Sequence, residues 1–132
     1  MKTVLLAKVA LATPALAQTP ASRSVQPVTI TMTDHGFVPR NIALRRGGSY
    51  VLHIANRSDK GHNLTQKAFF AAARLRSEDR GVVRDGQIVL AAGERATIRF
   101  QAPLTRRGGM FQFSSTTLGD ADNAYTGAFR IQ

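Results

Sequence analysis

Four side chains that are able to bind a metal or to react lie in two stretches of the chain. His62 follows a glycine near the middle of the sequence, and Ser115, Asp120 and Tyr125 lie in a polar segment near its end. An imidazole, a carboxylate and a phenolate together suit a hard ion such as Cu(II), Zn(II) or Fe(III), and metal affinity would rise with pH as the ligands lose their protons. Because the two stretches are distant in sequence, any joint chemistry depends on the fold that positions them.

Each of these residues also has a structural interpretation, which we favour. His62 can hold a loop closed through hydrogen bonds, Asp120 lies in a segment suited to turn hydrogen bonds, and Tyr125 can fill space with its hydroxyl near water or His62. Ser115 is expected to hydrogen-bond a backbone carbonyl or a neighbouring side chain. A serine hydrolase built from Ser115, His62 and Asp120 would also need an oxyanion hole and an oriented base, and the sequence signals neither. We therefore expect that the protein is not an enzyme.

Short segments in which apolar and polar residues alternate predict strands along most of the chain. The clearest covers residues 50–55, where Leu52 and Ile54 share one face and His53 lies on the other, at the surface. Further strands are expected around residues 28–33, 42–44, 88–90, 96–100, 111–113 and 129–131. Helical spacing from Thr65, a candidate cap, to about Arg76 predicts one short helix. The pattern predicts an all-β fold, a Greek-key antiparallel β-sandwich with one short helix.

A series of landmarks along the chain resembles those of bacterial periplasmic cupredoxins. Their order and spacing, which cover residues 28–132, are more specific than any single landmark. The landmarks are Phe37-Val38-Pro39, Ile42, Gly47 or Gly48, Tyr50, Asn56, Gly61-His62-Asn63, Phe69-Phe70, Ile88, Ala92-Gly93-Glu94 and Phe111-Gln112-Phe113. The resemblance implies a cupredoxin-like sandwich.

The resemblance also implies where a copper site would lie. Copper-binding members take one His from the loop after the Asn-bearing strand, which His62 matches, and Cys, His and usually Met from the loop before the last strand. Ser115, Asp120 and Tyr125 stand in those three places. A blue copper site needs a soft thiolate, so we expect a degenerate site with no cofactor. The resemblance adds His35 beside the same end, and His35, His62, Asp120 and Tyr125 remain an alternative, non-blue site for copper or another divalent ion.

The N-terminal residues are typical of an exported protein. Residues 1–17 have a basic start, an apolar stretch and an Ala15-Leu16-Ala17 segment, which predict a secretory signal peptide. This stretch is too short, and too interrupted by Lys8, to remain as a membrane span. Residues 18–27 are rich in Thr, Pro, Ser and Gln and predict a linker, and residues 28–132 are expected to form the cupredoxin-like domain. We expect a periplasmic or secreted location and a monomer.

Cysteine is absent from the chain and basic residues dominate its charge. The lack of cysteine excludes disulfides, a thiolate ligand and a cysteine nucleophile. The net charge is +10, and without residues 1–17 the 16 basic and 8 acidic residues give +8. Such a charge attracts anionic partners in a salt-dependent way, although a surface charged only for solubility is an open alternative. Nucleic acid is not an expected partner outside the cytoplasm.

The basic residues indicate which face a partner would use. Several of them lie in and after the expected helix, and others lie on nearby strands and turns. The first group comprises Lys67, Arg74, Arg76, Arg80 and Arg84, and the second comprises Arg40, Arg45, Arg46, Arg57 and Lys60. The sequence predicts a binding or accessory protein that meets an anionic protein or membrane surface and does not carry electrons. The alternative function is metal handling at the non-blue site.

Overall fold

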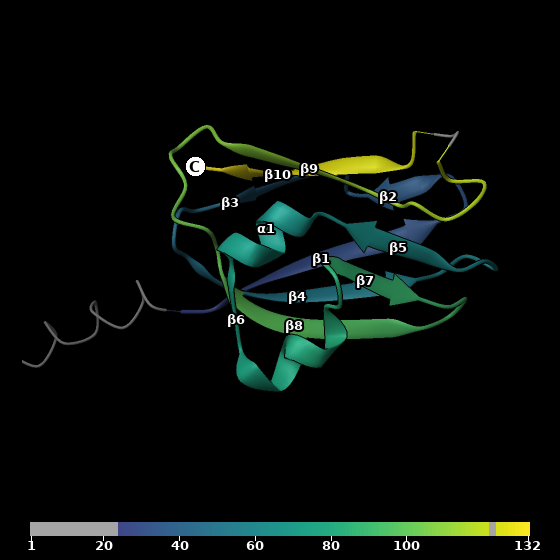
Figure 1. The fold of residues 1–132 in the computed structure, drawn as a ribbon, viewed down its shortest axis with the longest axis horizontal. Coiled ribbons are helices and arrows are strands. Elements are labelled where there is room, and N and C mark those ends of the chain that lie inside the picture. The colour runs from purple at the N-terminus through teal and green to yellow at the C-terminus, as the bar shows by residue number, and fades with distance from the viewer. Residues whose placement is uncertain (1–23, 122–123) are drawn as a thin grey trace, which may run out of the picture.

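The computed structural model describes residues 24–121 and 124–132, which form two facing β-sheets around one apolar core (Figure 1). The elements are β1 (Gln26–Thr33), β2 (Gly36–Val38), β3 (Asn41–Leu44), β4 (Ser49–Asn56), β5 (His62–Thr65), α1 (Lys67–Ala72), β6 (Arg74–Leu75), the 3-10 helix η2 (Ser77–Val82), β7 (Gln87–Leu90), β8 (Arg95–Gln101), β9 (Met110–Ser114) and β10 (Thr126–Ile131). The expected signal peptide, residues 1–17, lies outside the described residues. Because β1 begins at Gln26, the last two residues of the expected linker belong to the first strand.

The strand order confirms the predicted sandwich. One sheet has the order β2-β1-β4-β8-β6, and the other has the order β3-β10-β9-β5-β7. The structure differs from the expected antiparallel arrangement in two strand pairs, since β1 runs parallel to β4 and β3 runs parallel to β10. Alternation reports which face a side chain occupies but not the direction of the neighbouring strand, so the sequence pattern did not indicate these pairs.

The core is filled by the apolar faces of both sheets together with one face of α1. In β4, Leu52 and Ile54 are buried and His53 is exposed, as the alternation predicted. Phe69 of α1 stacks on Phe129 of β10 with ring centroids 4.1 Å apart, which fastens the helix to the second sheet. Full burial of such side chains contributes roughly 1.5–3 kcal/mol each. The packed sheets therefore form a rigid frame for the loops at their ends.

Gly127 allows β10 to lie close to its neighbours just after Tyr125. A Cβ at this position would lie 2.5 Å from two ring carbons of Phe113 and 2.6 Å from the carbonyl oxygen of Arg40. Because real Cβ atoms do not approach so closely, any side chain there would push β10 away from the core. Gly127 therefore fixes the position from which Tyr125 enters the end of the sandwich.

The helical segment is shorter than predicted and differs at its start. The α1 helix covers six residues, and its cap is Gln66, whose side chain accepts a hydrogen bond from the Ala68 backbone N–H; Thr65 instead ends strand β5. After Ala73 the chain forms the two-residue strand β6 and then η2, which Figure 1 shows at the lower edge of the molecule beyond β8. None of the helices formed by residues 24–121 and 124–132 is long and apolar enough to cross a bilayer.

Candidate functional site

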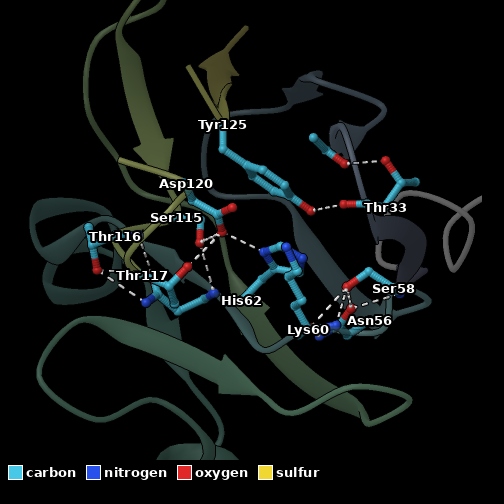
Figure 2. A network of polar contacts seen from close by, with 12 residues as sticks. Thr33, Asn56, Ser58, Lys60, His62, Ser115, Thr116, Thr117, Asp120 and Tyr125 are labelled. Atoms are coloured by element: carbon cyan, nitrogen blue, oxygen red, sulfur yellow. Dashed lines mark hydrogen bonds and ion pairs between the residues drawn. The ribbon is translucent and has the colours of Figure 1, made fainter. Parts of the chain in front are cut away.

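The candidate residues meet at one end of the sandwich, where β5 begins and where β9 and β10 are joined by a loop. His62 is the first residue of β5, Ser115 follows β9, and Tyr125 precedes β10. The Ser115 backbone N–H donates to the Tyr125 carbonyl at 3.0 Å, which brings the two ends of the loop together. The fold thus positions side chains that are distant in sequence around one centre (Figure 2).

The centre is the Asp120 carboxylate. A single oxygen, Oδ2, accepts hydrogen bonds from the Ser115 hydroxyl at 2.6 Å, from the Thr117 hydroxyl at 2.8 Å and from His62 Nδ1. The His62 side chain is 3% exposed and that of Asp120 is 12% exposed. A carboxylate only accepts hydrogen bonds, so the His62 proton lies on Nδ1 when Asp120 is ionised. We refer to His62, Ser115, Thr117 and Asp120 as the Asp120 cluster.

These contacts control the ionisation of Asp120. Partial burial by itself raises the pKa of the carboxyl, because it disfavours the charged form. The hydrogen bonds from Ser115, His62 and Thr117 act in the opposite direction and together outweigh burial, so the pKa lies below its ordinary value of 3.8. Asp120 is therefore a carboxylate at neutral pH.

Ser115 is engaged on both sides of its hydroxyl. Its Oγ donates to Asp120 and accepts from the Asn63 backbone N–H at 3.2 Å, which confirms the expectation that it hydrogen-bonds a neighbouring side chain. A serine nucleophile needs its proton to face an imidazole base. Here the hydroxyl proton faces a carboxylate and the residue is 2% exposed, so the arrangement differs from that of a hydrolase.

Tyr125 closes the cluster on its inner side. Its ring stacks on His62 with centroids 4.6 Å apart, and its hydroxyl donates to the Thr33 carbonyl oxygen, as Figure 2 shows. Burial raises the pKa of the phenol, and the charges of Asp120 and Asp34 raise it further. A tyrosinate ligand would have to be formed against all three effects. The ring is placed to fill space and hold the loop.

His35 is not brought together with the other candidates. It lies in the turn between β1 and β2 with an exposed side chain, whereas its neighbour Asp34 lines a cavity of about 530 Å³ beside His62 and Asp120. Residues 24–121 and 124–132 contain no group of three or more His, Cys, Asp or Glu side chains placed to hold a metal ion. In a turn, neighbouring side chains point in different directions, so a shift of one residue changes which one faces the cavity.

Thr117 and Asp34 are site residues that the sequence interpretation did not name. Thr117 lies three residues before Asp120, and besides the side-chain bond the Asp120 backbone N–H donates to the Thr117 carbonyl at 3.1 Å. A Thr separated from an Asp by two residues is a common turn pattern and would have been a usable signal. Asp34 carried no such signal, because its role comes only from the meeting of two distant loops.

The chain is similar to known proteins in its fold. No protein-family model and no curated protein sequence matches the chain. Among solved structures, the chain is similar to the dithionite-reduced auracyanin of the photosynthetic bacterium Roseiflexus castenholzii, with a TM-score of 0.59 and 15% identity over 83% of this chain and 98% of that one. It is also similar to auracyanin B, with a TM-score of 0.58 and 16% identity over 81% and 88% of the two chains. The fold is cupredoxin-like. At these identities the likeness concerns the fold alone.

The residues of this cupredoxin-like chain do not fit a blue copper ion. Such a site uses a thiolate and two imidazoles, and this chain has no cysteine and presents one imidazole at the Asp120 cluster. The Nδ1 atom of that imidazole already donates to the carboxylate, and the Ser115 hydroxyl is a poor ligand for Cu(I). The Nε2 atom of His62 is buried without a partner among the described residues, but one nitrogen does not make a site. The chain has the cupredoxin-like fold, but it has no thiolate donor, and the Asp120 cluster contains one imidazole where a blue copper site needs two.

Proposed function

We propose that the protein is an exported cupredoxin-like binding or accessory module, and neither an electron carrier nor an enzyme. The observation that carries this proposal is the convergence of three donors on one Asp120 oxygen, at the loop where the resemblance to cupredoxins locates the metal. The degenerate site is then a hydrogen-bond network in which three donors satisfy one carboxylate oxygen without an ion.

The energetics of the Asp120 cluster support this proposal. Hydrogen bonds to a charged group contribute about 1.5–3 kcal/mol each, so an ion that displaced the His62 and Ser115 bonds would first have to replace their contribution. Tyr125 would also have to lose its proton in a buried position where its pKa is raised. A metal therefore competes with a network that is already stable.

Metal handling at a non-blue site is the second candidate function. His62 Nε2 is the specific observation in its favour, because it is a buried nitrogen without a hydrogen-bond partner among the described residues. The adjoining cavity also carries the carboxylates of Asp34 and Asp59. A divalent ion bound there would have to recruit His62 and Asp120, and the remaining candidates, Tyr125 and His35, would require rearrangement.

A calorimetric titration decides between the two candidates. Metal-free protein, residues 18–132, is titrated with Cu(II) and separately with Zn(II), and the titration is repeated on His62→Ala and on His53→Ala. His53 is the matched control because it is an exposed histidine on β4. We expect no stoichiometric sub-micromolar binding in any of the three proteins. Tight binding that is lost in His62→Ala and kept in His53→Ala would establish the metal site and contradict the proposed function.

The net charge of the protein supports an anionic partner. The value of +10 comes with many exposed arginines, and only three ion pairs form among residues 24–121 and 124–132: His62–Asp120, Arg76–Glu78 and Arg99–Asp79. Exposed charges of one sign attract a partner of the other sign over about 10 Å at 0.1 M salt. Binding to an anionic partner should therefore weaken as salt is added, whereas metal binding at a partly buried site should change little.

A further inference from the structure

A second cavity, which shares no lining residue with the one beside the Asp120 cluster, lies where α1, β6 and η2 meet. It has a volume of about 570 Å³, which is within the range of roughly 300–1,000 Å³ found for ligand pockets. The less exposed part of its lining, which we call its floor, includes the apolar residues Phe70, Leu75 and Val83. Its remaining lining residues include Lys67, Arg74 and Arg80, whose side chains are exposed. We call this cavity, which combines apolar lining residues with three basic ones, the basic groove.

The cations of the basic groove form no ion pair with an acidic residue of the described chain. No acidic residue lines the groove, and none of the three ion pairs formed by the described residues includes Lys67, Arg74 or Arg80. Of the acidic residues nearest along the chain, Asp79 accepts from the Arg99 backbone N–H at 2.8 Å and Glu78 lies 3.7 Å from Arg76, while Asp85, exposed next to the lining residue Gly86, does not itself line the groove. The groove therefore presents positive charge that no ion pair of the described residues neutralises, and that an external anion can neutralise.

The shape of the groove favours a peptide over a membrane. A protein that inserts into a bilayer presents protruding apolar side chains beside its basic ones. Here the apolar atoms form a floor, and Phe70 is 7% exposed. The large apolar side chains that do protrude among the described residues, such as Val89 and Leu118, do not line the groove. A concave apolar floor inside a basic rim is complementary to a protruding apolar side chain flanked by acidic ones.

We infer that the basic groove is the docking site for an acidic segment of a partner protein, with one bulky apolar side chain on the floor and carboxylates at Lys67, Arg74 and Arg80. This inference rests on the proposed function, since it names the partner chemistry and the surface of the binding module. The charges provide orientation and the salt dependence, and the apolar side chain provides the buried contact.

The probe is a fluorescein-labelled heptapeptide with a central Phe between two runs of Asp and Glu, measured by fluorescence anisotropy against the full chain. Two control peptides separate the contributions, one with Ala in place of Phe and one with Asn and Gln in place of the acidic residues. We expect micromolar binding of the first peptide at low salt. Each control peptide should bind at least about tenfold more weakly.

Variants of the protein locate the site. Arg74→Glu with Arg80→Glu reverses two charges of the basic groove and should weaken binding of the acidic peptide by more than about tenfold. Arg107→Glu with Arg130→Glu is the matched control, because it makes the same change of net charge at two exposed residues that do not line the groove. Ala72→Phe fills the groove from the exposed face of α1 without any change of charge, and it should also abolish binding.

The outcomes distinguish a failure of this inference from a failure of the proposed function. Peptide binding that is insensitive to Arg74→Glu with Arg80→Glu, or weakened equally by the control pair, would contradict the assignment of the basic groove as the docking site. The proposed function, a basic binding module, would still stand. Binding of phosphatidylglycerol vesicles through Arg74 and Arg80, without binding of the peptide, would overturn the peptide partner in favour of a membrane. Sub-micromolar copper binding through His62 would contradict the proposed function itself.

Discussion

The Asp120 cluster and the basic groove both hold charge, but they differ in what their polar groups already contact. In the Asp120 cluster, three donors meet one carboxylate inside the protein. In the basic groove, the three cations have no counter-charge within the described chain. A polar group whose hydrogen bonds are made within the protein contributes to stability and has little hydrogen-bonding capacity left for a ligand. An unpaired surface charge contributes little to stability and is available for binding. In this fold, stability and recognition therefore belong to different regions.

The largest expected effect is on the stability of the Asp120 cluster. Asp120→Ala removes the acceptor of three donors and leaves buried His62 and Ser115 without it, so the free energy of unfolding should fall by about 3 kcal/mol. Asp59→Ala, an exposed carboxylate lining the same cavity, is the control and should change stability by less than about 0.5 kcal/mol. Urea denaturation at neutral pH measures both. Equal small effects would mean that the cluster is not a stabilising centre.

The pH dependence of stability should follow from the same carboxylate. The pKa of Asp120 is lowered in the folded protein, so its contribution is complete above the unfolded value of 3.8 and is lost as pH falls through the lower folded value. Asp120→Asn lacks this contribution at every pH. The difference in unfolding free energy between the protein and this variant should be constant near neutrality and should disappear in acid. A difference that grew on acidification would contradict the assignment.

A smaller effect is expected where the cluster meets the core. Tyr125→Phe removes the hydroxyl that donates to the Thr33 carbonyl and keeps the ring that stacks on His62. Loss of one such hydrogen bond should lower the unfolding free energy by about 1 kcal/mol. Tyr125→Ala, which also removes the stacked ring and leaves a cavity, should lower it more than Tyr125→Phe does, and chemical denaturation compares the two variants directly. Similar values would mean that the hydroxyl, and not the ring, is the important part.

The smallest effect on stability is expected in the basic groove. Arg74→Glu with Arg80→Glu should change the unfolding free energy by less than about 0.5 kcal/mol, because both side chains are exposed and form no ion pair with another described residue. The same pair of substitutions should nevertheless strongly weaken binding of the acidic peptide. Thermal unfolding and anisotropy on one preparation give both values. A large loss of stability would place these arginines among the structural residues and remove the contrast between the two regions.

The sequence predicted the sandwich because its strongest signals are local. Alternation along β4 placed Leu52 and Ile54 inside and His53 outside, and the structure has the same arrangement. The parallel pairs β1–β4 and β3–β10 were not predicted, because strand direction depends on chain connections and not on the face that each residue occupies. The helix start was displaced for a similar reason: Thr65 is a good cap by type, but it pairs with Ser114 and Gln87 as part of β5, and Gln66 becomes the cap.

The candidate site was predicted in part. The grouping of His62, Ser115, Asp120 and Tyr125 followed from the resemblance to cupredoxins, and the side chains do meet. What the sequence did not supply was the centre of the group, because no pattern showed that Asp120 would accept from His62, Ser115 and Thr117 at once. His35 and Asp34 illustrate the limit: in a turn, residue type and proximity do not determine which of two neighbours faces the cavity.

The place of β10 in its sheet has a consequence for how the chain folds. This strand, made of residues 126–131, lies between β3 and β9, so the second sheet has no continuous interior until the end of the described chain has been synthesised. The partners β3 and β10 are separated by most of the domain, and contacts at such sequence separation form slowly. The sandwich therefore cannot be completed early in synthesis. The contacts of His62 with Asp120 and Tyr125 form late, together with the pairing of β10 that completes the second sheet.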